Sequence, residues 1–205
     1  MLFALANLIR GEPWLTALSA PQDDLFQELS RQRVAVVGNA RSLEGGSNGA
    51  AIDGCDLVIR MHRAPMPQAK SHGSRTDWLA LGMPVPQDLV RARGVGRILW
   101  MARKRRRLRG WMVRSPGFYR HPPGTWSALA AELGAPPSTG AMVTDLVARS
   151  PAAEIHLFGF DFFASLSASG RRTADQVPHD FAAEQERVAR LMAADGRLVL
   201  HPPGG

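Results

Sequence analysis

The sequence holds very little cysteine: Cys55 is the one cysteine in 205 residues. An internal disulfide is therefore impossible, and a four-cysteine zinc site is excluded. The six histidines are scattered, and neither a His-Glu-x-x-His nor an Asp-x-Asp sequence occurs, so two common signs of a bound divalent metal are missing. The overall composition is that of an ordinary globular protein, with 45% hydrophobic and 21% charged residues. It suits one globular domain and excludes a disordered chain or a multi-span membrane protein.

Acidic residues are absent from one long stretch of the chain. Ten of the 25 basic residues lie between Arg91 and Arg114, where no Asp or Glu occurs, while the rest of the chain has 15 basic and 18 acidic residues. The net charge of +7 therefore comes from this arginine-rich segment, 91–114. Such a segment predicts peripheral contact with an anionic membrane or a phosphate-bearing glycan, or else a solvated face. A nucleic-acid-binding module is the least favoured alternative.

Long hydrophobic runs are also missing. The N-terminal run from Met1 to Ile9 ends at Arg10, well short of the roughly 20 apolar residues of a membrane-spanning helix. It has neither the positive leader nor the cleavage site of a signal peptide. Residues 1–30 therefore predict a helical segment that packs on the domain, with attachment to a membrane surface as the alternative. We expect a cytoplasmic protein, peripheral at most to the inner face of the membrane.

Short apolar runs alternate with helical spacing along the rest of the chain. Strands that alternate with helices are typical of a mostly parallel sheet flanked by helices, so we expect an α/β fold with one Rossmann-like domain over residues 1–205. In such a sheet, ligands bind in the loops that follow the carboxyl ends of the strands. The expected strands are 33–38, 56–62, 76–81, 97–101, 154–159 and 197–200, and the expected later helices are 126–133, 141–148 and 181–192.

The glycine-rich loop after the first expected strand is one candidate ligand site. Glycines let backbone amides approach a phosphate, but Gly38-Asn39-Ala40 lacks the second glycine of the dinucleotide fingerprint. The loop alone is therefore as consistent with a plain turn as with a nucleotide site. Asn39 stands out, because a polar amide directly after a buried strand can contact a base or a sugar.

Two further candidates lie at expected helix starts. Ser138 or Thr139 can cap the helix that follows, and the same hydroxyls and amides can instead bind an anion. His179 stands where Pro178 marks the start of a helix. The positive end of the helix dipole favours a neutral imidazole there, which is a usable base near neutral pH. A surface or capping histidine is the alternative.

Taken in order, these segments resemble the animal-type sialyltransferases, glycosyltransferase family 29. Residues 33–65, with Val34-Ala-Val-Val-Gly-Asn-Ala-Arg-Ser-Leu43, look like the large motif of that family. Residues 136–163, with Pro137-Ser-Thr-Gly-Ala-Met142 and His156-Leu-Phe-Gly-Phe-Asp161, look like its small motif. In residues 178–192, the pattern His-x-x-x-x-Glu looks like its very small motif. Three motifs in the right order make a specific resemblance.

The resemblance implies a variant GT-A-like glycosyltransferase fold and an inverting, metal-independent enzyme without a cofactor. The donor would be CMP-sialic acid or another CMP-linked ulosonic acid such as Kdo, and the acceptor a glycan or a lipid-linked glycan. His179 would be the catalytic base, supported by Glu184 from the same helix. The donor would be bound by the residues at the matching motif positions, namely Gly38, Asn39, Arg60, His62, Ser138, Thr139, Gly140 and Gly159.

The sequence departs from the family pattern in three places. His62 stands where the family has an asparagine, so that either the imidazole replaces the amide or the donor differs. Cys55 has no partner for the disulfide that joins the large and small motifs in the family. The histidine-containing motif before the very small motif is missing, and we expect Arg171 or Arg172 to contact the leaving phosphate instead. Without an anchor or stem, the chain resembles a compact bacterial relative.

A CMP-binding or other nucleotide-binding protein without transfer activity is the main alternative function. Such a protein would use Asn39 and Ser138 but tolerate the loss of His179. The presence of His179 and Glu184 beside the donor motifs favours the enzyme.

Overall fold

A central parallel sheet organises the chain in the computed structural model, which describes residues 2–162 and 176–202. Seven strands of the described residues lie in the order β5-β4-β3-β2-β1-β6-β7, and every neighbouring pair is parallel. The prediction of an α/β fold with a mostly parallel sheet is confirmed. The strands are β1 (Arg33–Val37), β2 (Leu57–Met61), β3 (Trp78–Leu81), β4 (Arg97–Trp100), β5 (Tyr119–Arg120), β6 (Glu154–Phe158) and β7 (Leu198–Leu200).

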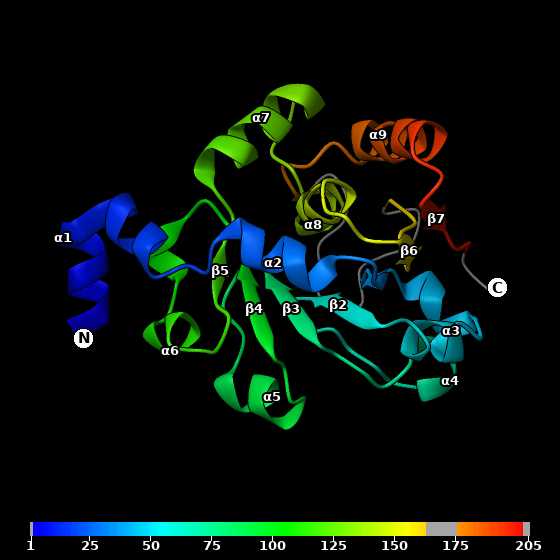
Figure 1. Cartoon of the computed structure of the whole chain (residues 1–205), viewed down its shortest axis with the longest axis horizontal. Coiled ribbons are helices and arrows are strands. Elements are labelled where there is room, and N and C mark those ends of the chain that lie inside the picture. The colour runs from blue at the N-terminus through cyan, green and yellow to red at the C-terminus, as the bar shows by residue number, and fades with distance from the viewer. Residues whose placement is uncertain (1, 163–175, 203–205) are drawn as a thin grey trace.

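Helices cover both faces of the sheet (Figure 1). The predicted helices form with small shifts at their ends, and several short helices that the sequence did not predict lie in the connections. The helices are α1 (Leu2–Ala17), α2 (Gln22–Leu29), α3 (Gly49–Asp53), α4 (Ala69–His72), α5 (Gln87–Ala92), α6 (Gly110–Val113), α7 (Pro123–Leu133), α8 (Thr139–Ala148) and α9 (Phe181–Ala194), with 3-10 turns η1 (Arg41–Gly45) and η2 (Arg105–Arg107).

The alternation of apolar side chains along the strands builds two cores, one on each face. Val34 and Val36 of β1 pack beneath the layer of α2, α7, α8 and α9. Ala35 and Val37 face the other way, against Ile52 of α3. A third cluster joins α1, α5 and α6 to β3 and β4 on that second face. Because successive residues of a strand point to opposite faces, a strand that is buried on both sides is apolar at successive positions, as β1 is from Val34 to Val37.

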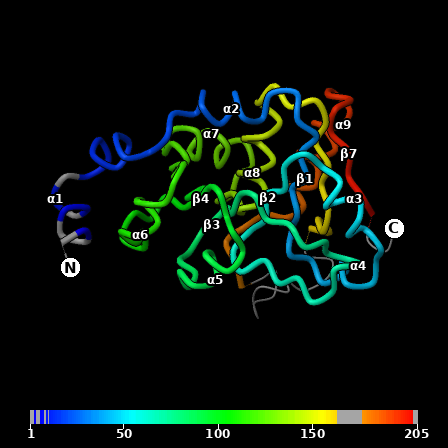
Figure 2. Tube along the Cα trace, turned by 60° about the horizontal axis from the view of Figure 1, so that its bottom comes forward, coloured from blue at the N-terminus to red at the C-terminus, as the bar shows by residue number. Residues whose placement is uncertain are grey.

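The chain order creates a switch point between β1 and β6. From β1 the chain moves outward through β2, β3, β4 and β5, and then returns to the other side of β1 as β6 and β7. The loops after β1 and β6 therefore leave the sheet in opposite directions, and a crevice is expected between them at the carboxyl ends of the strands. The Cα trace in Figure 2 shows α1 and α6 at one end of the molecule and α3, α4 and β7 at the other.

The arginine-rich segment 91–114 is not one element. It includes the end of α5, all of β4, η2 and α6. Arg97 is buried and pairs with Glu28, so it belongs to the packing of the sheet. Only the part after β4 forms a continuous surface segment.

Among the described residues, no helix is long and apolar enough to cross a membrane.

Candidate functional site

Two glycines bring the loops after β1 and β6 into contact. The amide of Gly38 donates to the carbonyl of Phe158 at 2.7 Å. A Cβ atom on Gly38 would lie 2.2 Å from the carbonyl oxygen of Gly159, which no side chain can tolerate. Gly159 itself has a φ of 65°, in the region that favours glycine. Both positions therefore need glycine, because the two loops approach too closely for a side chain at Gly38 and the backbone at Gly159 has a positive φ.

Asn39 connects the loop after β1 to the end of β2. Its side-chain Nδ2 donates to the carbonyl of Met61 at 3.1 Å. His62, the residue after Met61, has a positive φ of 55°. Its amide donates to the carbonyl of Ala80 in β3 at 2.9 Å. Asn39 and His62 therefore lie at the carboxyl ends of adjacent strands.

The His62 ring packs against Gly82, directly after β3. A Cβ on Gly82 would lie 3.1 Å from Cε1 of His62 and 2.8 Å from Oγ1 of Thr139. Nδ1 of His62 is buried and has no hydrogen-bond partner in the described part of the chain. Enclosure of the ring, and to a smaller degree the nearby His179, lowers the pKa of His62 to about 4. His62 is therefore neutral at pH 7.

The start of α8 is capped by a serine and faces an aromatic ring. Oγ of Ser138 accepts from the amide of Ala141 at 3.1 Å, as an N-cap residue does. Gly140 lies under the ring of Phe160, since a Cβ there would be 3.0 Å from the ring. Helix geometry leaves the amides of Thr139 and Gly140 without an intrahelical acceptor. These amides make the start of α8 suited to an anion.

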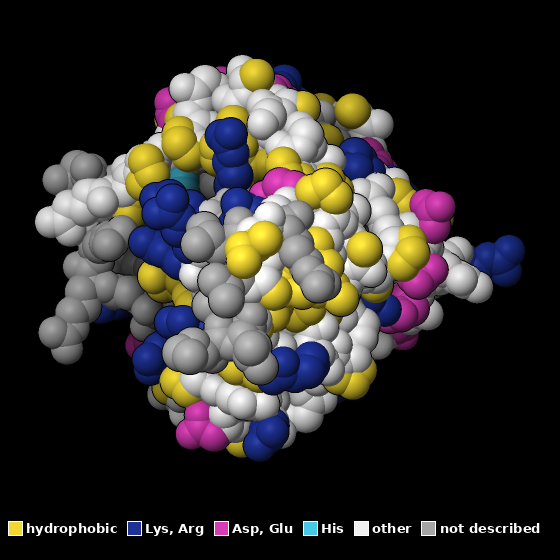
Figure 3. Space-filling view, turned by 90° about the vertical axis from the view of Figure 1, so that its left-hand side faces the viewer, with side chains coloured by type: hydrophobic (Ala, Val, Ile, Leu, Met, Phe, Trp, Pro, Cys, Tyr) yellow, Lys and Arg dark blue, Asp and Glu magenta, His cyan; other side chains and the backbone are white. Residues whose placement is uncertain are grey.

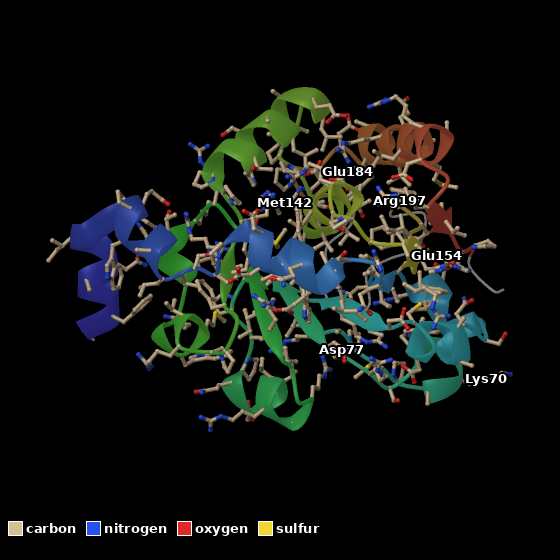
Figure 4. All side chains as sticks on the ribbon, in the orientation of Figure 1. Lys70, Asp77, Met142, Glu154, Glu184 and Arg197 are labelled. Atoms are coloured by element: carbon tan, nitrogen blue, oxygen red, sulfur yellow. The ribbon has the colours of Figure 1, made fainter. Side chains whose placement is uncertain are left out.

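Glu184 of α9 holds the same helix start. Its Oε1 accepts from the backbone amide of Ser138, and its Oε2 accepts from the Ser138 hydroxyl, each at 2.7 Å. Glu184 is 5% exposed, and Figure 4 shows it between α9 and α8. Burial raises the pKa of Glu184, while the two hydrogen bonds from Ser138 oppose that shift. Both donors of Ser138 are therefore committed to Glu184.

His179 precedes α9 and is fixed by one hydrogen bond. Its Nδ1 lies 2.8 Å from the carbonyl oxygen of Pro136. Because a carbonyl only accepts, Nδ1 must carry the proton, and Nε2 of the neutral ring is left with its lone pair. Asp180 caps α9 by accepting from the amide of Ala183 at 2.9 Å. The imidazole is thus presented as a base through Nε2.

Arg187 anchors α9 to the helices beside it. Its guanidinium contacts Asp145 of α8 at 2.6 Å and Glu132 of α7 at 3.0 Å. Arg187 and Asp145 are each 10% exposed. Because both are nearly buried, this pair fixes where α9, and with it Glu184, lies relative to α8.

The structure does not bring every predicted site residue to this edge. Arg60 is 1% exposed, and its guanidinium donates to the carbonyls of Arg75 and His72 at 2.7 and 2.5 Å, next to α4. Burial lowers the pKa of Arg60 to about 10. Its side chain thus holds α4 in place. Arg171 and Arg172 lie outside the described residues.

Gly82 and Phe160 are site neighbours that the sequence reasoning missed. Gly82 directly follows the expected strand 76–81, as Gly38 lies at the end of the first expected strand, so a search after every strand would have found it. Phe160 follows Gly159 in the small-motif stretch. A further contact, from the hydroxyl of Ser42 to Oδ2 of Asp161 at 2.8 Å, joins the loops after β1 and β6.

A separate hollow of about 740 Å³ lies between α5 and α6. Its lining includes Arg91, Trp111 and Arg114, together with Gly94 and Ser115, which precede β4 and β5. It therefore lies toward the amino ends of the strands, opposite the candidate site. Within residues 2–162 and 176–202, no group of three or more His, Cys, Asp or Glu side chains is placed to hold a metal ion.

A sequence comparison matches residues 13–88 to the family model of glycosyltransferase family 29 (sialyltransferase). The resemblance to the sialyltransferases is confirmed. The matched residues contain the large-motif stretch 33–65, whereas the stretches 136–163 and 178–192 lie outside them. No curated protein matches the sequence.

Solved sialyltransferases share the fold. A mammalian sialyltransferase in complex with Gal-beta-1-3GalNAc-ortho-nitrophenol aligns with a TM-score of 0.65 and 18% identity, over 100% of this chain and 78% of that one. The sialyltransferase CstII from Campylobacter jejuni, in complex with the substrate analogue CMP-3FNeuAc, aligns with a TM-score of 0.56 and 11% identity, over 82% of this chain and 80% of that one. The predicted GT-A-like fold is confirmed, and the family match together with this fold supports the prediction of a sialyltransferase-like glycosyltransferase.

Proposed function

We propose that this protein transfers sialic acid, or a related ulosonic acid, from a CMP-linked donor to a hydroxyl of a glycan, with inversion and without a metal ion. One observation carries the proposal: Glu184 binds both donors of Ser138. This contact joins α9 to the start of α8, and it brings the base His179 beside the amides suited to an anion.

The donor has two anionic groups, a phosphate and a sugar carboxylate. The amides of Thr139 and Gly140 at the start of α8 can bind one of them, helped by the helix dipole. The close approach of Gly38 and Gly159 joins the loops after β1 and β6 at the switch point, which is where a nucleotide would bind in a sheet of this kind. The solved CstII in complex with CMP-3FNeuAc supports a donor of this class.

His179 would act as the general base. Nε2 takes the proton of the acceptor hydroxyl as that oxygen forms a bond to the anomeric carbon. The bond from this carbon to the phosphate oxygen breaks at the same time, and CMP leaves with the electron pair. Attack opposite the leaving group inverts the anomeric carbon. The hydrogen bond from Nδ1 to Pro136 would steady the imidazolium that forms.

His62 would face the donor as a neutral group. With a pKa of about 4 it carries no charge at pH 7, so it can hydrogen-bond in place of the family's asparagine amide. CMP leaves as a monophosphate, with less charge than a diphosphate, so amides and hydroxyls can stabilise it without a metal. The guanidinium of Arg171 or Arg172 would contact the leaving phosphate and stabilise its negative charge.

The acceptor would be a glycan, free or linked to a lipid. The solved mammalian relative was crystallised with a disaccharide glycoside, which supports a glycan acceptor. The predicted contact of segment 91–114 with an anionic membrane would bring the enzyme to an acceptor that is carried by a lipid.

CMP release tests this function. Purified protein is given CMP-sialic acid and, separately, CMP-Kdo, with EDTA present and a glycan acceptor supplied. We expect release from one of the donors that survives EDTA and disappears in His179→Ala, which also identifies the sugar. No release and no CMP binding would refute the proposal. CMP binding that is equal in wild type and His179→Ala, with no release in either, would favour the nucleotide-binding alternative.

A further inference from the structure

The first half of α1 and the segment that follows β4 form one surface. Nδ2 of Asn7 donates to the carbonyl of Arg105 at 2.9 Å, and the Arg105 guanidinium donates back to the carbonyl of Asn7 at 3.1 Å. Asn7 is buried in this contact. A Cβ on Gly110 would meet the side chain of Phe3 at 3.0 Å, so α6 also packs against α1. We name residues 2–17 together with 101–114 the α1–η2 surface.

The α1–η2 surface carries an excess of positive charge over residues 103–109. Glu12 is its one carboxylate, and it pairs with the buried Arg120 of β5. Within the described residues, none of the cations at 103–109 pairs with a carboxylate, and Arg106, Arg107 and Arg109 are exposed. Figure 3 shows this end of the molecule, with Lys and Arg side chains spread over it.

Apolar side chains lie among these cations. Ile9 of α1 is 72% exposed, an unusual position for a large aliphatic side chain. Phe3, Trp14 and Trp111 are only partly buried, and the rings of Phe3 and Trp14 pack at 5.6 Å. An exposed aliphatic side chain on a helix beside arginines that have no carboxylate partner is a combination found in proteins that lie on membrane surfaces.

The position of the α1–η2 surface relates it to the candidate site. Arg103 follows β4 at its carboxyl end, and its guanidinium lies over the ring of Trp126 in α7 at 5.3 Å. The site residues Asn39, His62 and Gly159 follow other strands at the same edge of the sheet. The part of the α1–η2 surface that begins at Arg103 therefore lies at the same edge of the sheet as the candidate site.

We propose that the α1–η2 surface docks on an anionic lipid bilayer. The arginines bind the headgroups, and Ile9 enters the boundary between headgroups and acyl chains. The exposed apolar side chain favours lipid over a soluble polyanion, which would use the charges alone. Docking of this kind does not depend on the donor or on the transfer step.

Co-sedimentation of the full-length protein with vesicles tests the proposal. Vesicles of phosphatidylcholine with phosphatidylglycerol are compared with phosphatidylcholine alone. The charge variant is Arg106→Gln/Arg107→Gln, and the apolar variant is Ile9→Ser. Arg31→Gln/Lys70→Gln removes the same charge from exposed positions elsewhere and serves as the control; Lys70 lies at the far end of the molecule (Figure 4).

We expect wild type to bind only the phosphatidylglycerol vesicles, and less strongly as salt increases. The charge variant should bind about 25-fold more weakly, from the attraction of each arginine to an anionic surface, and the control should stay near wild type. Ile9→Ser should also bind more weakly. Equal binding to both kinds of vesicle, no binding to either, or a control as weak as the charge variant would overturn the proposal. Ile9→Ser that binds like wild type would overturn it in favour of a soluble polyanion.

CMP binding, measured on the same samples, separates this proposal from the transfer function. Arg106→Gln/Arg107→Gln should bind CMP as wild type does, because neither residue lies at the candidate site. If this variant loses vesicle binding but keeps CMP binding, the lost function is membrane docking by the α1–η2 surface, and the donor site is unaffected.

Discussion

The carboxylate of Glu184 binds Ser138, the N-cap residue of α8, through two hydrogen bonds: the amide and the hydroxyl of Ser138 donate to the two carboxylate oxygens at 2.7 Å each. The pair joins two segments that are 46 residues apart in the sequence. Ser138 is therefore a link between α8 and α9, and it stands beside the amides of Thr139 and Gly140, which have no acceptor within the helix.

A double-mutant cycle at Ser138 and Glu184 tests this link. Ser138→Ala removes one hydrogen bond and the cap of α8, and we expect it to lower the free energy of unfolding by about 1–2 kcal/mol. Glu184→Ala leaves the Ser138 amide without its partner and should cost about 1–3 kcal/mol. The two changes should be coupled by about 1 kcal/mol in chemical denaturation. Strictly additive effects would show that the hydrogen bond between the Ser138 hydroxyl and Glu184 contributes nothing to stability.

Gly82 should be sensitive to a single added carbon. In Gly82→Ala the new Cβ meets Thr139 and His62, so both must shift. We expect a loss of about 1–3 kcal/mol in the free energy of unfolding and about tenfold weaker CMP binding in a calorimetric titration. Gly124→Ala in α7 is the control, because nothing lies within 4 Å of its Cβ. CMP binding that is equal in the two variants would contradict the placement of Gly82 at the site.

Two buried histidines predict acid sensitivity. Burial lowers the pKa of His121, which is 3% exposed, to about 4, as for His62. The unfolded chain takes up these protons near pH 6.5, before the folded chain does. Stability that is present above pH 6.5 is therefore lost as the pH falls toward 4. For His121 this amounts to on the order of 3 kcal/mol.

His121→Leu should flatten this pH dependence, which is measured by urea unfolding from pH 7 to pH 4.5. His156→Gln, which removes a histidine near the protein surface, is the matched control. If the free energy of unfolding falls with pH equally steeply in His121→Leu and in wild type, His121 is not the cause of the acid sensitivity.

The two carboxylates that contact Arg187 should contribute unequally to the free energy of unfolding. Asp145 is 10% exposed, and Asp145→Ala leaves a nearly buried guanidinium with one partner fewer, at a cost of about 3 kcal/mol. Glu132 is 44% exposed, and Glu132→Ala should cost less than about 1 kcal/mol. Thermal unfolding of both variants measures the difference, and equal effects would contradict the burial argument.

Much of the fold follows from the sequence. Val34 to Val37 of β1 form a run of apolar residues that must be buried on both faces, and such a run is visible without a structure. β5 was missed because it has only two residues at the edge of the sheet, Tyr119 and Arg120. The short helices α3 to α6 were missed because four to six residues do not complete a hydrophobic period.

The sequence predicts most of the residues that lie at the candidate site, but it does not predict the hydrogen bonds between them. The three motif stretches meet at one edge of the sheet, as their positions after strands and before helices indicate. Arg60 differs because its place inside β2 directs its side chain to the face of Val58 and α4, which alternation along the strand could have shown. That Glu184 occupies both donors of Ser138 depends on how α9 packs, and no local pattern encodes it.

The most direct test of the donor assignment is a titration of the wild-type protein with CMP, with UMP as the matched comparison. The account predicts that CMP binds, that UMP binds more weakly, and that His179→Ala binds CMP as wild type does, because the base acts on the acceptor. Absence of CMP binding, or equal binding of CMP and UMP, would contradict it.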